Sequence, residues 1–296
     1  MLGGMHTEKQ FGEQEMKKFM ARVKDLPTLP VIVTKIMQIA KDEKSSAKDL
    51  GTMISRDPSI SSRVLRLANS AFYGYSRAIT SIPQAVVVLG FETVKSLALS
   101  ASVFDVLGRG DSRFFDREKF WLHSIGCAKA CELLAKQVRF PDPDSAFVAG
   151  LLHDIGKVVL DRFFSEEYQQ VMSRIQESPR PIIEVEKEIL LGVGHDSVGF
   201  WLGQQWKFPT VLLDPIHHHH DPENSEPQGI LMASIAHVGD SITRKVGIGS
   251  GGDSLVPNIC LDSRKVLNLD DDSLLELSLN LGKEQGNIEE FFQVLG

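Results

Sequence analysis

Residues 149–157 read Ala-Gly-Leu-Leu-His-Asp-Ile-Gly-Lys. In this stretch an apolar helical run ends in an adjacent imidazole and carboxylate, His153 and Asp154. Neighbouring side chains on a helix point about 100° apart, so the pair binds one metal ion, or bridges two, only if ligands from other helices meet it. An isolated His-Asp pair is more often a helix cap or a surface feature. Whether this pair binds metal therefore depends on residues elsewhere in the chain.

Apolar residues recur at helical spacing on both sides of this stretch, whereas strand-like alternation is weak. Pro58 after Asp57 is typical of a helix start, and Asp270–Asp272 favour a helix N-terminus in the tail. The predicted helices cover residues 8–24, 31–41, 46–55, 58–70, 82–89, 91–107, 117–137, 144–155, 165–176, 181–203, 209–220 and 228–245. The sequence therefore predicts an all-α fold.

Two loops divide the chain by composition. The first is Gly108 to Asp116, and the second is Gly-Ile-Gly-Ser-Gly-Gly-Asp at 247–253, which has the composition of a flexible linker. A prior of roughly 150 residues per domain suggests two lobes. The predicted parts are an N-terminal helix over 1–25, an N-terminal helical lobe over 26–110, a metal-binding helical lobe over 111–246, and a linker with a helical tail over 247–296.

Composition excludes several classes of protein. The 296 residues carry 32 Lys and Arg against 39 Asp and Glu, a net charge of −7, which disfavours binding to a nucleic-acid duplex or an anionic membrane. No run reaches the ~20 apolar residues of a membrane span. The chain has three cysteines, an odd number, so a disulfide framework is excluded. Cysteines without a disulfide framework fit a reducing compartment, and a cytoplasmic location is therefore expected.

Histidine is the unusual component, because seven of the nine lie between His153 and His237. His123 lies among apolar neighbours on the preceding predicted helix, His195 follows a glycine, and Asp240 lies on an apolar helix where a charge needs a partner. Residues 217–220 are four consecutive histidines, of which at most two can face one site, and adventitious metal binding is the alternative for this run. Imidazoles and carboxylates spread over separate helices suit a divalent metal such as Fe or Mn.

Cys127 and Cys131 continue the helical face of His123 at i+4 and i+8. The stripe resembles a soft ligand set. Buried free cysteine more often packs as a small apolar residue, and core packing is our expectation for both.

Taken with further motifs, these residues resemble the HDOD family, the HD-related output domains within the superfamily of His-Asp metal-dependent phosphohydrolases. The motifs are Leu-Pro-Thr-Leu-Pro at 26–30, Ile-Ser-Arg-Asp-Pro-Ser-Ile at 54–60, Leu-Arg-Leu-Ala-Asn-Ser-Ala-Phe-Tyr-Gly at 65–74, Ile-Pro-Gln-Ala at 82–85, Leu-Leu-His-Asp-Ile-Gly-Lys at 151–157 and His-His-Asp-Pro-Glu at 219–223. The resemblance implies a two-lobed helical fold whose C-terminal lobe is a bundle of the HD phosphodiesterase type.

The resemblance also implies a ligand set. The related HD-GYP phosphodiesterases place metal ligands in the order His, His-Asp, His, His-His, Asp, which here implies His123, His153, Asp154, His195, His219, His220 and Asp240. Two departures from these relatives stand out. The Gly-Tyr-Pro signature is absent after His220, and Lys119 occupies the place of a glutamate that accompanies a third metal. A site with one or two metal ions is therefore expected.

Two functions are consistent with this pattern. In the first, the chain is a signal-transduction module that binds a signalling protein partner or a nucleotide ligand, with homodimer formation left open, and its metal site is a scaffold. In the second, it is a metal-dependent phosphohydrolase acting on a nucleotide or cyclic dinucleotide. Asp154 would then bridge two metal ions, and Lys157 would contact the phosphate as a point charge. The alternative for Lys157 is a solvated lysine at a helix end.

Overall fold

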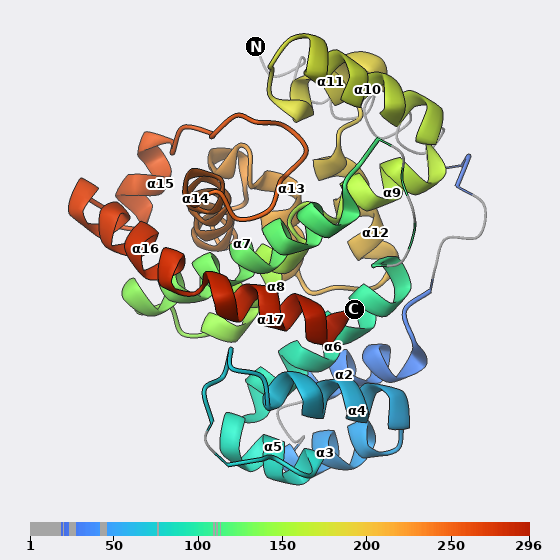
Figure 1. The fold of residues 1–296 in the computed structure, drawn as a ribbon, viewed down its shortest axis with the longest axis vertical. Helices are drawn as coiled ribbons and strands as arrows, with labels where there is room; N and C mark the ends of the chain where they lie inside the picture. The colour runs from blue at the N-terminus through green and yellow to red at the C-terminus, as the bar shows by residue number, and fades with distance from the viewer. Residues whose placement is uncertain are drawn as a thin grey trace.

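The computed structural model describes residues 19, 21–23, 28–41, 46–75, 77–108, 110, 112 and 114–296. Every regular element within these residues is a helix, which confirms the predicted all-α fold (Figure 1). The predicted N-terminal helix over 1–25 lies almost entirely outside the described residues, and the 108–116 loop lies partly outside them. None of the described helices has the length and apolar character needed to cross a membrane.

The helices form two groups. The first consists of α2 (Val31–Lys41), α3 (Ala47–Ser55), α4 (Pro58–Ala68), α5 (Ile82–Leu89) and α6 (Phe91–Leu107). The second consists of α7 (Arg117–Gln137), α8 (Pro143–Leu152), α9 (Ile155–Phe163), α10 (Ser165–Glu177), α11 (Ile182–Ile189), α12 (His195–Gln205), α13 (Thr210–His218), the short 3-10 helix η1 (Pro222–Asn224) and α14 (Ile230–Val246). The chain ends with α15 (Leu261–Val266), α16 (Asp271–Lys283) and α17 (Gln285–Leu295).

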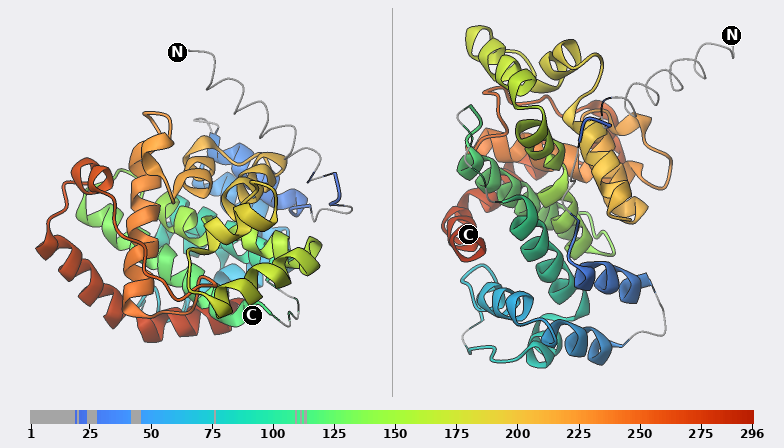
Figure 2. Two further views of the ribbon diagram at one scale, coloured as in Figure 1. Left: turned by 90° about the horizontal axis from the view of Figure 1, so that it is seen from above. Right: turned by 90° about the vertical axis from the view of Figure 1, so that its right-hand side faces the viewer.

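The helices of the first group pack on one another at one end of the molecule (Figures 1 and 2). Their starts follow from local chemistry. Ser46 and Asp49 form a reciprocal capping box for α3, and the Asp57 side chain accepts the backbone N–H groups of Ser59 and Ile60. The helix start predicted at Asp57 and Pro58 is therefore confirmed.

The second group is built around α7, α8 and α14, which pack against one another, while α10 and α11 lie at the far end of the molecule from α3 and α5 (Figure 2). Residues 145–152 of α8 are buried on all sides, so this helix runs through the interior. The two groups are joined by α6, which contacts α4 and α8, and by α17, which contacts α4 and α7. The predicted domain boundaries stay a prediction.

Two predicted helices are each interrupted by a turn. The helix predicted over 144–155 ends at Leu152, and α9 begins at Ile155, so His153 and Asp154 occupy the turn between them. The helix predicted over 181–203 is in fact α11 and α12. Leu191 and Gly192 separate these helices with φ angles of 56° and 90°, which no right-handed helix contains. Apolar periodicity alone does not report such a break.

The segment 247–253 is held in place, although its composition suggested a flexible linker. The Ser250 N–H donates to the Lys119 carbonyl at 2.9 Å, and the Asp253 carboxylate accepts from the Ile182 N–H at 3.1 Å. Gly249 adopts φ +62°, and a Cβ there would lie 2.3 Å from the His123 backbone nitrogen. Glycine therefore allows this segment to lie directly against α7, beside the buried histidines.

Candidate metal centre

Seven side chains predicted as ligands converge on one buried centre in the second group of helices. His123 comes from the N-terminal third of α7 and Asp240 from α14. His153 and Asp154 come from the turn between α8 and α9, His195 is the first residue of α12, and His219 and His220 follow α13. The other two histidines of the run lie elsewhere, since His217 stacks on Phe200 and His218 lies near Asp221. The structure thus brings all seven predicted positions together; their role as ligands stays a prediction.

A glycine explains how α9 and α12 approach closely enough to build the centre. A Cβ on Gly156 would lie 2.0 Å from the His195 carbonyl oxygen and 2.7 Å from the Gly199 nitrogen. Only a residue without a side chain allows this backbone contact. The glycine of the 149–157 stretch therefore places His195 opposite Asp154.

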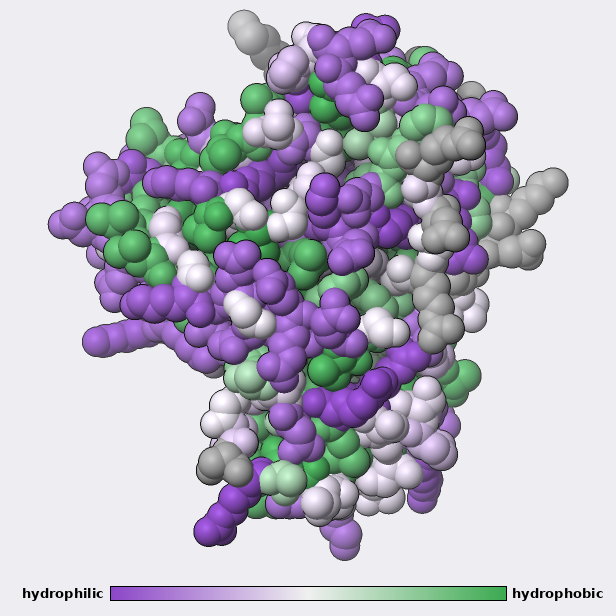
Figure 3. Space-filling model, viewed as in Figure 1, coloured by the Kyte–Doolittle hydropathy of each residue, from purple (hydrophilic) through white to green (hydrophobic). Residues whose placement is uncertain are grey.

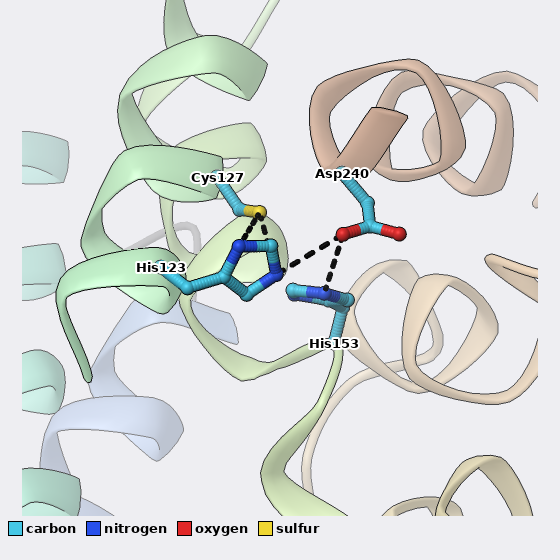
Figure 4. A group of neighbouring side chains, drawn as sticks. All are labelled: His123, Cys127, His153 and Asp240. Carbon is cyan, nitrogen blue, oxygen red and sulfur yellow. Dashed lines mark hydrogen bonds and ion pairs between the residues drawn. The ribbon is translucent and has the colours of Figure 1, made fainter. Parts of the chain in front are cut away.

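The donor atoms form two groups of four. In the first, His123 Nε2 lies 3.0 Å from Asp240 Oδ1, and His153 Nε2 lies 3.8 Å from the same oxygen (Figure 4). The Cys127 sulfur belongs to this group and lies 3.4 Å from His123 Nε2. All donor atoms of the group lie within 4.8 Å of one another.

The second group consists of Asp154, His195, His219 and His220. The Nε2 atoms of His195 and His219 lie 3.1 Å and 3.5 Å from Asp154 Oδ1, and His220 Nε2 lies 2.8 Å from His195 Nε2. This group contains nitrogen and oxygen donors alone.

Asp154 connects the two groups. Its Oδ1 faces His195 and His219, whereas its Oδ2 lies 3.3 Å from His153 Nε2 and 3.9 Å from His123 Nε2. One carboxylate therefore presents an oxygen to each group, which is the arrangement needed to bridge two cations.

Hydrogen bonds on the outer ring nitrogens orient three of the imidazoles. His153 Nδ1 donates to the Gly150 carbonyl at 2.7 Å, and His219 Nδ1 donates to the Pro215 carbonyl at 3.1 Å. His195 Nδ1 donates to Glu186 Oε2 at 2.6 Å. Each bond leaves Nε2 facing the centre, as in metal sites where second partners orient histidine ligands. Glu186 was not predicted from the sequence, because it lies nine positions before His195 and is brought to that ring only by the fold.

Each central carboxylate has a buried cation beside it. Lys157 Nζ donates to Asp154 Oδ2 at 2.5 Å and to the Gly251 carbonyl at 2.8 Å. Arg244 donates to Asp240 Oδ1 at 2.8 Å and to Asp253 Oδ1 at 2.9 Å. Lys157 is 0% exposed, so the alternative of a solvated lysine is wrong. Arg244 was also missed, although its position one helical turn after Asp240 was a usable signal.

The charges around the centre favour ionised carboxylates. Burial would raise the pKa of Asp154, but His153, Lys157 and His195 hold that pKa well below its usual value. Burial likewise opposes the effect of Arg244 and His123, which hold the pKa of Asp240 well below its usual value. Burial lowers the pKa of His219 to about 4, so this imidazole is neutral at pH 7. These are the protonation states that a metal ion requires of its ligands.

His195 differs, because its carboxylate partner outweighs its burial. Burial lowers the pKa of His195, whereas the charge of Glu186 raises it, to about 9 overall. At pH 7 a metal ion that binds His195 Nε2 must therefore displace a proton from this imidazole.

Unpartnered polar atoms provide a test of whether a metal ion fits. His153 Nε2, Asp154 Oδ1 and His219 Nε2 are buried and form no well-directed hydrogen bond among the described residues, although each lies within 3.5 Å of a polar atom of the centre. Buried polar atoms are rarely left unsatisfied without a ligand or a functional reason. All three atoms face the centre between the two groups, so the donor set fits a divalent metal ion. The residues that would hold it are the seven predicted positions, with Cys127 added to the first group.

Comparisons with known proteins agree with this architecture. The model of the HDOD domain matches residues 26–222. The solved structure of an HDOD domain protein of unknown function from Geobacter sulfurreducens is 27% identical, has a TM-score of 0.83, and covers 94% of this chain and 97% of its own. A candidate phosphohydrolase from Shewanella amazonensis SB2B is 25% identical, with a TM-score of 0.75 and coverage of 94% and 98%.

The curated relatives are longer proteins. An uncharacterized protein of Treponema pallidum is 26% identical over 231 residues, which is 73% of this chain and 42% of that protein. The chain thus spans less than half the length of this relative.

Proposed function

The chain belongs to the HDOD domain family, and from that premise we propose that it is a regulatory module of a bacterial-type signalling system. In this proposal the second group of helices holds one or two divalent metal ions as a structural scaffold. The module acts by binding a signalling protein partner or a nucleotide ligand. Turnover of a substrate is not its role.

The burial of the metal centre is the main support for this proposal. Six of the seven predicted ligands, His123, His153, Asp154, His195, His219 and Asp240, are at most 3% exposed, and His220 is the partly exposed exception. A hydrolytic site keeps a coordination position open to substrate and water. Lys157 and Arg244 are also engaged internally with the carboxylates, so neither cation is free to receive a phosphate. These features support a closed scaffold.

The surface also supports a protein partner. Leu261, Leu275 and Leu279 of α15 and α16 are exposed by 71%, 54% and 59%. Figure 3 shows hydrophobic patches on the side of the molecule where these helices lie. The net charge of −7 disfavours a nucleic-acid duplex as the partner. A second copy of the chain in a homodimer remains one form that such a partner could take.

The alternative proposal is a metal-dependent phosphohydrolase, and the bridging position of Asp154 favours it. The likeness to the candidate phosphohydrolase of Shewanella amazonensis also supports it. Bound divalent metal would supply Lewis acidity and activate water for attack on phosphorus. In this proposal substrate enters beside His220, and Lys157 contacts phosphate only after leaving Asp154.

Metal analysis combined with turnover assays distinguishes the two proposals. The untagged full chain is purified without chelator, its metal content is measured, and Fe- and Mn-loaded samples are incubated with cyclic dinucleotides, nucleotides and bis(4-nitrophenyl) phosphate. We expect bound metal and no turnover. His153→Ala should contain less metal than the wild type, whereas His218→Ala, outside the centre, should keep the full amount.

Each contrary result has a defined meaning. Turnover by the wild type that disappears in Asp154→Asn would overturn the regulatory proposal in favour of the hydrolase. Wild-type protein that contains no metal and binds none on reconstitution would overturn the metal scaffold itself.

A further inference from the structure

The first donor group contains a thiol that the family ligand order does not include. Cys127 is fully buried one helical turn after His123 on α7, and its sulfur faces the same space as the His123 ring and the Asp240 carboxylate (Figure 4). Cys131, one turn further along, instead directs its sulfur to the Ile235 carbonyl at 3.6 Å. The expectation of core packing therefore describes Cys131, whereas Cys127 lies in a polar site.

Three of the six distances among the four donor atoms lie close to those of tetrahedral coordination. Zinc bonds of about 2.0–2.3 Å to nitrogen, oxygen and sulfur place neighbouring ligand atoms roughly 3.3–3.8 Å apart in a tetrahedron. The distances here are 3.4 Å from Cys127 Sγ to His123 Nε2, 3.0 Å from that nitrogen to Asp240 Oδ1, and 3.8 Å from Asp240 Oδ1 to His153 Nε2. Helix α7, helix α14 and the turn after α8 thus hold four donor atoms that all lie within 4.8 Å of one another, close enough to share one ion.

A second observation points to a ligand in this space. His153 Nε2 is buried, faces the group and forms no well-directed hydrogen bond among the described residues. Asp240 Oδ1 accepts from Arg244 and also lies 3.0 Å from His123 Nε2 and 3.8 Å from His153 Nε2, so the arginine orients the carboxylate without replacing a metal ion. Thiol packing by itself does not call for two imidazoles and a carboxylate around the sulfur.

We propose that Cys127 is a metal ligand, and that His123, Cys127, His153 and Asp240 together hold a thiophilic divalent ion, zinc in preference to iron or manganese. Binding forms a metal–sulfur bond and releases the thiol proton to solvent. Thiolate donors select such ions, whereas the second group offers nitrogen and oxygen donors alone. The two halves of the centre therefore differ in metal preference. This inference rests on the metal centre proposed above.

Cobalt substitution tests the proposal without any measurement of activity. Metal-free full-length chain is titrated with Co(II), since a cobalt–thiolate bond produces an intense near-ultraviolet charge-transfer band that nitrogen and oxygen donors do not. We expect this band in the wild type and its loss on addition of Zn(II). Cys127→Ser should lose the band and retain cobalt bound at the second group. Cys131→Ser, the matched control on the same helix, should keep the band.

The outcomes separate this inference from the proposed function. Cobalt that binds to the wild type without the band overturns the role of Cys127 and leaves the metal centre standing. Failure of the wild type to bind any cobalt overturns both. A band that survives in Cys127→Ser and Cys127→Ala also overturns the assignment. Because the wild-type spectrum alone can refute the inference, the test does not depend on the folding of the variants.

Discussion

Replacing Lys157 with methionine should destabilise the metal-free chain far more than the metal-loaded chain. Lys157 is fully buried and contacts the Asp154 carboxylate and the Gly251 carbonyl. Removing one partner of a buried ion pair costs about 3–5 kcal/mol, because the remaining charge is uncompensated. A bound metal ion compensates Asp154 itself, so in the loaded form the main loss is the hydrogen bond to Gly251, about 1–3 kcal/mol. The two losses should differ by about 2 kcal/mol.

Urea unfolding of both forms measures this difference. The free energy of unfolding is obtained for the wild type and for Lys157→Met, each with excess chelator and each with saturating metal. Lys136→Met serves as the control, because Lys136 forms an exposed pair with Glu132 and should lose at most about 1 kcal/mol in either form. By thermodynamic linkage, the variant should also bind metal roughly 30-fold more tightly, the equivalent of about 2 kcal/mol.

Two results would refute this reasoning. An equal loss in both forms would mean that the metal ion does not share the role of Lys157 beside Asp154. A loss below about 1 kcal/mol in the metal-free chain would mean that Asp154 is not an ionised carboxylate dependent on this lysine.

Three further predictions concern the same fold. Gly156→Ala should lower the free energy of unfolding by about 1–3 kcal/mol or more and reduce metal content, because the added Cβ would collide with the His195 carbonyl. Urea denaturation and metal analysis measure both effects, and unchanged values would contradict the close approach of the two backbones. In chelator, stability should be greatest near pH 6.5. His219 has a pKa of about 4 in the folded chain and binds a proton less readily there than in the unfolded chain, so the free energy of unfolding falls as pH drops from 6.5 toward 4. His195 has a pKa of about 9 in the folded chain, so its protonated form stabilises the fold fully below pH 6.5 and this contribution is lost as pH rises toward 9. Urea midpoints across this range should therefore form a bell, and a monotonic trend would count against it. Asp57→Ala should lower stability by about 1 kcal/mol through loss of the α4 cap, whereas Asp57→Asn should retain most of it.

The fold class was predictable because helical periodicity and caps are local properties. Asp57 with Pro58 marks the start of α4, and Asp270 accepts the Ser273 N–H at the start of α16, as their residue types predict. The interruptions were less predictable. Leu191 has a positive φ without being glycine, and the chain leaves the helix at His153 within an apolar run. Tertiary contacts decide these turns against local preference.

Part of the candidate centre was also predictable, because residue type, like a helix cap, is a local property of the sequence. Residue type identifies His153, Asp154 and Asp240 as potential ligands, because imidazole and carboxylate in apolar surroundings need a partner. Glu186 and the Gly251 carbonyl gave no such signal. The first is an acidic residue in an amphipathic helix, and the second is a backbone group in a glycine-rich segment whose composition suggested flexibility. Their roles depend on packing between segments far apart in the chain.

By itself, the sequence determined the all-α class and the family motifs, and its resemblance to the HDOD family and the related HD-GYP enzymes implied the seven histidine and aspartate positions that could bind metal. The tertiary structure decided how these positions divide into two groups, that Asp154 joins them, that Cys127 and not Cys131 enters the first group, and that Lys157 is buried against Asp154. The physical reason is that side-chain chemistry is encoded residue by residue. The few ångströms between donor atoms, by contrast, are set by helix packing and by glycines such as Gly156 that let backbones touch. These atoms lie on α7, α12 and α14 and on the turns that follow α8 and α13.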